Sequence, residues 1–465
     1  MTINAADTSS IISKVMQTIE NEKKQYLQEG VSDVGNDTQH KEIINKLNEK
    51  HAVIMLNGKC LILNEVINPA NDLPDVDFST LPDFKAWYQN QKTTIVVREQ
   101  KQEITIADYW LDHRDRREFS GLVFDPEQKT DPSYYNLWRG FAVTPQKGNW
   151  SKMEDHIFKN ICSKDTELFQ YLMAWMARIV QFPGGDRPGV VLVLKGKQGT
   201  GKGMLVNNFG KIFGQHYKHI ISPHLLTGRF NDHLKDCLLM FVDESFWAGD
   251  KQGEGPLKGM ITESHFHVEA KHKQAFLIKN HTNFIFASNN SWVVPADTEE
   301  RRFFCIDVSD TKIKNSKYFG EIQTQMDNGG REAMLYSLLH LNITDFDFRN
   351  FPRREALLNQ ILHSWPSPKK FWFECLRNGS FGKQNYWPLE YPTADFYELF
   401  TTFSKVAGDR FLTQDKMFGK QIRELCPGIE RKQKGNGERY YRFPSLNDCR
   451  TALESAVKIR INWNE

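Results

Sequence analysis

The chain has 465 residues, enough for roughly three domains, and its 40% hydrophobic and 25% charged residues are ordinary for a globular protein. Its 60 basic and 58 acidic residues leave a net charge of +2, so any nucleic-acid surface must come from local clusters of basic residues. No apolar stretch approaches the roughly 18 residues of a membrane helix, and the seven cysteines lack C-x-x-C spacing. We therefore expect a soluble cytoplasmic protein with reduced, buried thiols, no signal peptide and no membrane span.

The first 160 residues divide into a polar arm and an accessory region. In residues 1–38, apolar side chains recur at helical spacing from Ile11 to Ile19, which predicts a short amphipathic helix for packing or oligomerisation, followed by a linker. Residues 39–160 are predicted to form a small α+β accessory region. It contains short apolar runs typical of hairpin strands, at 52–56, 60–63 and 93–97.

Asp75 and Asp77 form an acid-x-acid pair in this region, a pattern that could belong to the metal-binding pair of a primase. The surrounding sequence Asn-Asp-Leu-Pro-Asp-Val-Asp is typical of a solvated loop. No second acidic or histidine motif lies near the pair. The loop interpretation is therefore favoured.

Residues 161–345 carry the pattern of an α/β domain. An amphipathic helix is predicted from Thr166 to Val180, ended before Pro183. Residues 189–310 then alternate apolar strands with helical patterns, as a parallel sheet requires.

Residues 346–465 are predicted to form a C-terminal helical and winged-helix-like domain. A tight turn at Gly435-Asn436-Gly437 joins two strands between Ile429 and Phe443, after a helical run from Met417 to Leu425. Three basic residues on this hairpin are candidate nucleic-acid contacts: Arg431, Lys432 and Lys434. Two interpretations fit these residues equally well. The hairpin could be a wing that lies on nucleic-acid phosphates, or a charged sheet edge that discourages aggregation.

The segment 196–203 reads Gly-Lys-Gln-Gly-Thr-Gly-Lys-Gly and follows the apolar run Val190–Leu194. A glycine-rich loop between a strand and a helix lets backbone N–H groups surround phosphate oxygens, and a lysine adds charge. The candidate nucleotide-binding residues are Gly196, Gln198, Gly199, Thr200, Gly201, Lys202 and Gly203. Gly203 stands where the usual motif has the serine or threonine that binds magnesium, and a plain surface loop is the alternative.

Polar residues follow two later strands. Asp243 and Glu244 end the apolar run 238–242, where Asp243 could bind Mg²⁺ and Glu244 could polarise the attacking water. Asn289 follows the strand 284–288 and could bond the γ-phosphate. Exposed strand ends and asparagine turns are the alternatives.

Two basic groups complete the set. Arg301 and Arg302 precede another strand, and one of them could stabilise phosphoryl transfer in a neighbouring subunit, while a salt bridge to Asp297 or Glu299 is the alternative. A hairpin predicted at 266–278 carries three basic residues near its tip: Lys271, His272 and Lys273. Alone, such a tip is more often a solvated turn.

In this order, the motifs GKQGTGKG, LLMFVDE, VEAKHK, FIFASNN and EERRFF resemble those of superfamily 3 helicases, the AAA+ ring motors of small viruses, phages and plasmids. The chain is similar to the helicase part of phage and plasmid primase-helicases, which are themselves similar to the primase-associated ATPases of poxviruses. Five motifs fall within about 110 residues, and looser flanking matches extend the resemblance over most of residues 41–450. No primase catalytic motif appears in the first 150 residues.

The resemblance implies an α/β fold with an AAA+ P-loop core, ATP and Mg²⁺ as cofactors, and a homo-oligomeric ring, expected to be hexameric, in a bacterial host cell. Lys271, His272 and Lys273 would line a central channel and hold single-stranded or forked DNA by its backbone. Movement from 3′ to 5′ and a primase or polymerase partner are further expectations. The alternatives are a nucleotide-regulated DNA-binding initiator or loading platform with little unwinding and, more remotely, an RNA-directed motor.

Overall fold

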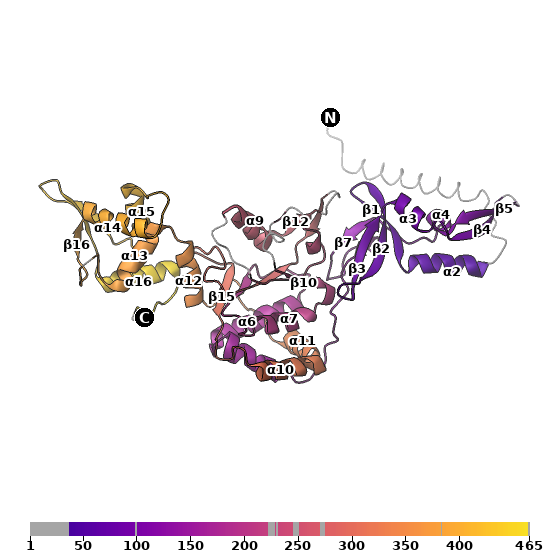
Figure 1. Ribbon diagram of the computed structural model, residues 1–465, viewed down its shortest axis with the longest axis horizontal. Coiled ribbons are helices and arrows are strands. Elements are labelled where there is room, and N and C mark those ends of the chain that lie inside the picture. Colours follow the sequence, from indigo (N-terminus) through magenta and orange to yellow (C-terminus); the bar gives the residue numbers. More distant parts are fainter. Residues whose placement is uncertain are drawn as a thin grey trace, which may run out of the picture. The chain divides into compact units, whose positions relative to one another are not determined.

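The computed structural model describes residues 37–97, 100–221, 228, 231–244, 251–269, 275–382 and 384–463 (Figure 1). The predicted helix from Ile11 to Ile19 and the predicted channel residues Lys271, His272 and Lys273 lie outside these ranges. The chain divides into two compact units. The first comprises Met1–Val123 and Lys129–Leu137, and the second comprises Phe124–Gln128 and Trp138–Glu465.

The first unit is an α+β fold around a sheet with the strand order β3–β2–β1–β6. Its described strands are β1 (His51–Leu56), β2 (Lys59–Asn68), β3 (Leu73–Ser79), β4 (Lys92–Val97), β5 (Gln100–Thr105), β6 (Glu118–Phe119), β7 (Gly121–Val123) and β8 (Tyr134–Asn136). Its described helices are α2 (Asp37–Asn48), α3 (Leu81–Trp87) and α4 (Ile106–Asp112). The predicted hairpins are confirmed, because β1 pairs antiparallel with β2 and β4 with β5.

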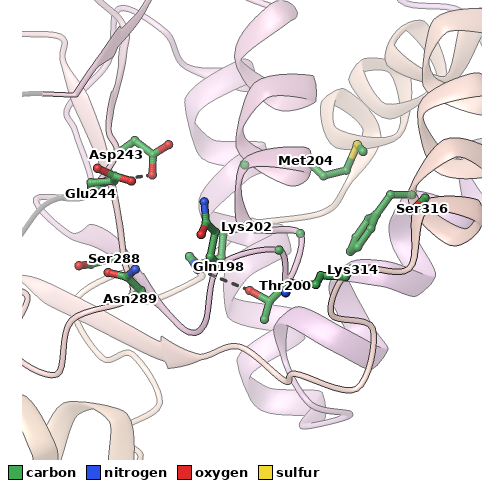
Figure 2. A pocket seen from close by; sticks show the side chains of 14 residues that line it. Gln198, Thr200, Lys202, Met204, Asp243, Glu244, Ser288, Asn289, Lys314 and Ser316 are labelled. Carbon is green, nitrogen blue, oxygen red and sulfur yellow. Dashed lines mark hydrogen bonds between the residues drawn. The ribbon is translucent and has the colours of Figure 1, made fainter.

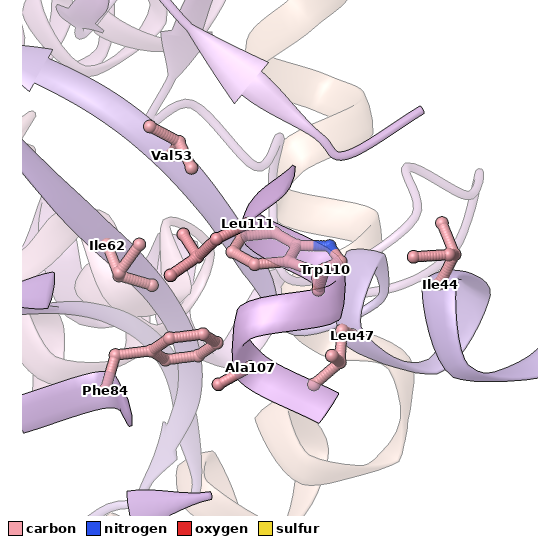
Figure 3. Packing of buried hydrophobic residues seen from close by; sticks show 8 residues of the cluster. All are labelled: Ile44, Leu47, Val53, Ile62, Phe84, Ala107, Trp110 and Leu111. Atoms are coloured by element: carbon pink, nitrogen blue, oxygen red, sulfur yellow. The ribbon is translucent and has the colours of Figure 1, made fainter. Parts of the chain in front are cut away.

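Local capping and a small core hold this unit together. Thr105 begins α4 by accepting a hydrogen bond from the Asp108 backbone N–H at 3.0 Å. Figure 3 shows the indole of Trp110 packed among apolar side chains from three helices and two strands. The fully buried indole Nε1–H donates to Asn48 Oδ1 at 2.8 Å, so its polar end is satisfied.

Two predictions about this unit are wrong. Asp75 and Asp77 lie in β3 rather than in a loop, paired with β2 and alternating with the buried Val76. The alternation of a strand with one buried face explains this, because the two acids share the opposite face. Cys60 is exposed, whereas the other six cysteines are buried thiols.

The second unit contains a fully parallel five-stranded sheet with the order β10–β11–β14–β9–β15. Its strands are β9 (Val191–Lys195), β10 (Tyr217–Ile220), β11 (Leu239–Val242), β14 (Asn283–Ser288) and β15 (Phe303–Asp307). The four residues of β11 and the six of β14 are all buried, as expected for strands covered on both faces. The predicted parallel α/β sheet is therefore confirmed.

Helices and a hairpin accompany this sheet. The described elements are α5 (Ser151–His156), η1 (Ile157–Ile161), α6 (Thr166–Gln181), α7 (Lys202–Lys211), η2 (Gly214–His216), η3 (Asp232–Leu234), α9 (Lys251–Thr262), β12 (His265–Val268), β13 (Phe276–Lys279), α10 (Ser316–Gln325), η4 (Met326–Gly330) and α11 (Arg331–His340). Strands β12 and β13 pair antiparallel, which confirms the predicted hairpin. In the part of the chain that the structure describes, no helix is long and apolar enough to cross a bilayer.

The remainder of the second unit combines five helices with a three-stranded sheet of order β16–β18–β17. Its elements are α12 (Glu355–Ser364), α13 (Ser367–Asn378), β16 (Glu390–Pro392), α14 (Thr393–Val406), α15 (Asp415–Leu425), β17 (Glu430–Gln433), β18 (Arg439–Arg442) and α16 (Leu446–Val457). The hairpin β17–β18 is confirmed where the Asn-Gly turn predicted it. Aromatic side chains fill the core beneath it, with Phe396 and Phe418 both fully buried.

Candidate functional site

The glycine-rich loop lies between β9 and α7 at the carboxyl end of the sheet. The side chain of Lys202, at the first position of α7, folds back so that its Nζ donates to the carbonyl oxygens of Gly196 at 2.5 Å and Lys197 at 2.9 Å. Burial lowers the pKa of Lys202, and the nearby Asp243 carboxylate opposes that shift. A phosphate oxygen could replace these carbonyls as the acceptor for the ammonium group.

Gly201 shows why the loop needs glycine. Its φ is +91°, a left-handed conformation that side chains rarely adopt, and it caps the start of α7. An added Cβ would lie 2.6 Å from ring atoms of both His156 and Phe319. Both the backbone conformation and the space therefore exclude a larger residue.

Buried polar side chains support the loop from behind. His156 Nε2 lies 3.3 Å from Gly201 O, which can only accept, so Nε2 carries the proton and Nδ1 accepts from the Tyr318 hydroxyl at 3.1 Å. Burial lowers the pKa of His156 to about 4, which keeps the ring neutral at pH 7. Asn160, in the π-helical turn η1, donates to Thr200 O at 2.8 Å. The sequence analysis missed these supports because each is a single polar residue in a helical segment without a motif.

One cavity of about 600 Å³ joins the loop to both later strand ends (Figure 2). We call it the loop cavity. It is lined by Gln198, Gly199, Thr200, Gly201, Lys202, Gly203, Met204, Asp243, Glu244, Ser288, Asn289, Lys314, Ser316 and Phe319. In Figure 2, Asp243, Glu244 and Asn289 lie together on one side of Lys202, and Ser316 lies on the other. The sheet order explains this, because β14 lies between β9 and β11 and all three strands end at the same edge.

The acidic end of β11 is conformationally unusual. Glu244 has φ of +55°, a strained conformation for a residue with a Cβ, and its N–H donates to Asp243 Oδ1 at 3.0 Å. His219 Nε2 on the adjacent β10 lies 3.6 Å from Asp243 Oδ2. Carboxylate oxygens are the ligands that Mg²⁺ prefers, so Asp243, beside the glycine-rich loop, could hold this metal, whereas Gly203 has no side-chain ligand atom.

The loop between β15 and α10 supplies lining residues that the sequence analysis missed. Lys314 has φ of +55°, and its N–H donates to Gly199 O at 3.3 Å. In the same segment Asp310 pairs with Lys197 at 2.7 Å. No sequence motif marks this segment, and only the parallel pairing of β15 with β9 brings it to the loop.

The structure does not bring Arg301 and Arg302 to the loop cavity. Both precede β15, so they lie at the amino edge of the sheet, one strand length, roughly 16 Å, from the loop. Arg302 is 19% exposed and lies 3.6 Å from the fully buried Glu300, rather than pairing with Asp297 or Glu299. Arg301 is exposed, and among the described residues its side chain has no ion pair.

The three basic residues of the C-terminal hairpin β17–β18 each have an acidic partner. Arg431 lies 3.5 Å from Asp415, Lys432 lies 2.8 Å from Glu430 and Lys434 lies 3.1 Å from Glu438. These exposed pairs favour the interpretation as a charged edge, since pairing offsets the field that a phosphate would meet.

Comparison with known proteins adds three findings. Residues 194–302, which include the whole glycine-rich loop, the acidic pair, Asn289 and both arginines, match the model of a family of unknown function, DUF5906. A DNA primase-polymerase of Nitratiruptor phage NrS-1 is 31% identical over 180 residues, which cover 37% of this chain and 25% of that protein. The match thus spans about a quarter of the relative's length.

Solved structures of the NrS-1 C-terminal region are similar in fold. One apo structure aligns with a TM-score of 0.57 and 17% identity, over 82% of this chain and 95% of that one. A second, the A form, aligns with a TM-score of 0.56 and 18% identity, over 82% and 96%. At this identity the likeness concerns the fold alone.

Proposed function

We propose that the chain is an ATP-driven motor of the AAA+ superfamily 3 type that acts on DNA during replication of a phage or plasmid-like element. The observation that carries this proposal is the loop cavity, where Lys202, Asp243, Glu244 and Asn289 converge from three separate strand ends. The similarity to a phage DNA primase-polymerase supports the biological setting.

The proposed chemistry divides among the four residues. Lys202 and the N–H groups of the loop bind the β- and γ-phosphates. Asp243 holds Mg²⁺ together with phosphate oxygens and water, Glu244 orients and polarises the attacking water, and Asn289 bonds the γ-phosphate without competing for the metal. Mg²⁺ supplies charge neutralisation at the transferred phosphate when it is bound.

The arginine ahead of β15 is proposed to act in a neighbouring copy of the chain. Because Arg301 lies at the sheet edge opposite to the loop, it cannot reach a nucleotide bound in the same chain. In a ring with nucleotides between subunits, it could reach the nucleotide of a neighbouring subunit. The Arg302 side chain is mostly enclosed beside Glu300, whereas Arg301 is exposed, so we assign the catalytic role to Arg301 and a packing role to Arg302. We propose that the basic residues between β12 and β13 hold single-stranded DNA in the channel of a hexameric ring. These residues are Lys271, His272 and Lys273.

The test is ATP hydrolysis with and without single-stranded DNA. Lys202→Ala and Glu244→Gln are each expected to lower DNA-stimulated hydrolysis by a factor of about 100 or more, since each removes a group needed in the transition state. Lys164→Ala, an exposed lysine outside the loop cavity, is the control. Hydrolysis that survives Lys202→Ala would rule out the proposal.

The motor function has its own test. Lys271→Ala combined with Lys273→Ala is expected to preserve basal hydrolysis and to stop separation of a forked duplex. The double variant removes contacts to the DNA phosphates but leaves the loop cavity intact. Unchanged unwinding by that double variant would contradict the channel assignment.

A nucleotide-regulated initiator or loading platform is the second candidate. Gly203 favours it, because the loop lacks the hydroxyl that normally helps to hold magnesium during turnover. Strand displacement from a forked duplex at saturating ATP distinguishes the two functions. Robust displacement excludes the platform, and nucleotide-dependent assembly without displacement excludes the motor.

A further inference from the structure

A second, positively charged cavity lies at the opposite edge of the sheet from the loop cavity. Its volume is about 280 Å³, and its charged lining consists of Glu299, Glu300, Arg301, Arg349, Arg353 and Lys458. We call it the basic cavity. A neighbouring cavity of about 570 Å³ shares Arg353 and Lys458 with it, so the two adjoin.

Three cations of the basic cavity are available to a ligand. Arg301, Arg349 and Lys458 are exposed, and within the ranges that the structure describes none of their side chains has an acidic partner. Glu300 is fully enclosed, and its Oε1 accepts from the N–H groups of Arg301 and Arg302. Among the lining residues this leaves three exposed cations against the exposed carboxylate of Glu299, and Asp297 acts on Arg353 from just outside the lining. The cations remain in excess, a combination that favours an anion.

Arg353 fixes the parts of this cavity relative to one another. Its guanidinium donates to Glu300 O on the segment before β15, to Thr298 O at 3.4 Å and to Val457 O at 2.8 Å. Val457 ends α16, and Lys458 follows it directly. One half-buried arginine therefore ties the backbone beside Arg301 to the backbone beside Lys458, although 157 positions separate the two in sequence.

Lys458 has a left-handed backbone conformation, in which a glycine would be more stable than a lysine. Its φ is +56° and its ψ is +38°, and it ends α16 where glycine is the usual residue. A residue with a Cβ carries strain in this conformation. Because Lys458 lines the basic cavity, its ammonium group lies where an anion would be received.

We propose that the basic cavity receives the triphosphate bound in the loop cavity of a second copy of the chain, with Arg349 and Lys458 acting beside Arg301. This inference rests on the proposed function and deepens it, because it makes the C-terminal helices part of the nucleotide site. The three cations would add to Lys202 of the second copy in neutralising charge on the transferred phosphate.

The first experiment measures DNA-stimulated ATP hydrolysis by the full chain carrying Lys458→Gly. Glycine removes the ammonium group and suits φ of +56°, so the thermal midpoint should stay unchanged or rise while kcat falls by a factor on the order of ten to a hundred. Lys458→Arg should retain most of the activity. The matched control is Lys164→Gly, an exposed lysine with φ of +66° outside both cavities, which should leave kcat unchanged.

Mixing experiments test whether the two cavities form one site. Lys202→Ala chains mixed with Lys458→Gly chains should regain hydrolysis, since an intact loop cavity can then meet an intact basic cavity. Lys202→Ala mixed with Glu244→Gln should not, because both changes damage the loop cavity. Failure to regain activity in the first mixture would overturn the proposal.

The remaining outcomes separate this proposal from the proposed function. If Lys458→Gly and Arg349→Gln hydrolyse ATP like the unchanged protein while Lys202→Ala is inactive, the basic cavity has no part in catalysis and the proposed function stands. If Lys202→Ala is fully active, the proposed function itself fails. Weakened binding of a single-stranded oligonucleotide without nucleotide, at unchanged basal hydrolysis, would assign the basic cavity to nucleic acid and overturn the proposal.

Discussion

The loop cavity and the C-terminal hairpin β17–β18 were both marked in the sequence by lysines and glycines, yet the structure treats their charges differently. In the loop cavity, Lys202 is partly buried and bonds only backbone carbonyls and a hydroxyl, with Asp243 and Asn289 across the space. On the hairpin, Lys432 and Lys434 lie beside carboxylates and face solvent. The difference indicates that a candidate binding site is better recognised by convergent polar groups around a cation without a paired carboxylate than by the number of basic residues.

The largest effect that would sharpen this comparison is expected from Gly201→Ala. The methyl group would meet His156 and Phe319 at 2.6 Å, and alanine disfavours φ of +91°. We expect a loss of more than about 2 kcal/mol in unfolding free energy and loss of ATP binding. Calorimetric unfolding and nucleotide titration check both.

Gly437→Ala provides the corresponding change in the hairpin. Its φ is +89°, and an added Cβ would meet only the Gln433 side chain at 3.8 Å. It should cost stability through the backbone alone and leave ATP binding intact. Equal loss of ATP binding in both variants would contradict the special role of the loop.

The next largest effect is expected from acid, which should lower the free energy of unfolding of the second unit. Burial lowers the pKa of His156, His216 and His281 to about 4, well below the usual value of about 6.5 in an unfolded chain. Between pH 6.5 and 4 the unfolded state therefore binds more protons, so stability falls as pH falls through this window. Each histidine should cost about 1–2 kcal/mol by pH 5.

Unfolding by urea at pH 7.5, 6 and 5 measures this effect. His156→Gln should reduce the slope of stability against pH between 6.5 and 5, because glutamine does not titrate there. The hairpin offers the contrast, since hydrogen bonds from Lys432 and Lys434 lower the pKa values of Glu430 and Glu438. Those ion pairs therefore persist throughout the window, and a stability that is independent of pH from 7.5 to 5 would contradict the buried neutral histidines.

The loop cavity was largely predictable from sequence, whereas the basic cavity was not. Lys202, Asp243 and Asn289 each follow an apolar strand, and parallel strands must end at one edge of a sheet, so pattern and topology together imply that the residues meet. Arg349 and Lys458 follow no such rule. Arg349 lies in a segment without regular structure, and Lys458 ends a helix that Arg353 holds in place.

For the hairpin β17–β18, the elements were predictable from the sequence but the ion pairs were not. Its strands and turn follow from the Asn-Gly signal, but its ion pairs depend on which acids lie opposite. Asp415 reaches Arg431 from the start of α15, and Glu390 reaches Arg442 from β16 at 2.9 Å. Such long-range partners are decided by tertiary packing, so the two interpretations of the hairpin could not be separated from the sequence.

Gly203→Ser tests the unusual position in the loop with a smaller expected effect. A Cβ there would meet only Asn207 Nδ2 at 3.7 Å, so the side chain has room. Replacing a helical glycine should raise stability by about 0.5 kcal/mol. The hydroxyl adds a ligand near the phosphates, so the Mg²⁺ concentration that half-saturates hydrolysis should fall about two- to tenfold.

Gly203→Ala is the control, because it provides the same backbone effect without the oxygen. A magnesium requirement that changes equally in both variants would contradict a role for the hydroxyl. An unchanged requirement in both would mean that phosphates, water and Asp243 already saturate the metal site.

The smallest effect is expected from Lys434→Ala on the hairpin. Removing a lysine that contacts a DNA phosphate lowers the slope of log affinity against log salt concentration by about one. Lys434 instead lies 3.1 Å from Glu438, and its ammonium stands over the ring of Tyr440 at 5.6 Å. We therefore expect an unchanged slope and an affinity for single-stranded DNA within about twofold, measured by fluorescence anisotropy from 50 to 300 mM salt. A slope lowered by one would mean that DNA displaces Glu438 from the lysine, and the hairpin would then resemble the phosphate site that we propose at the loop cavity.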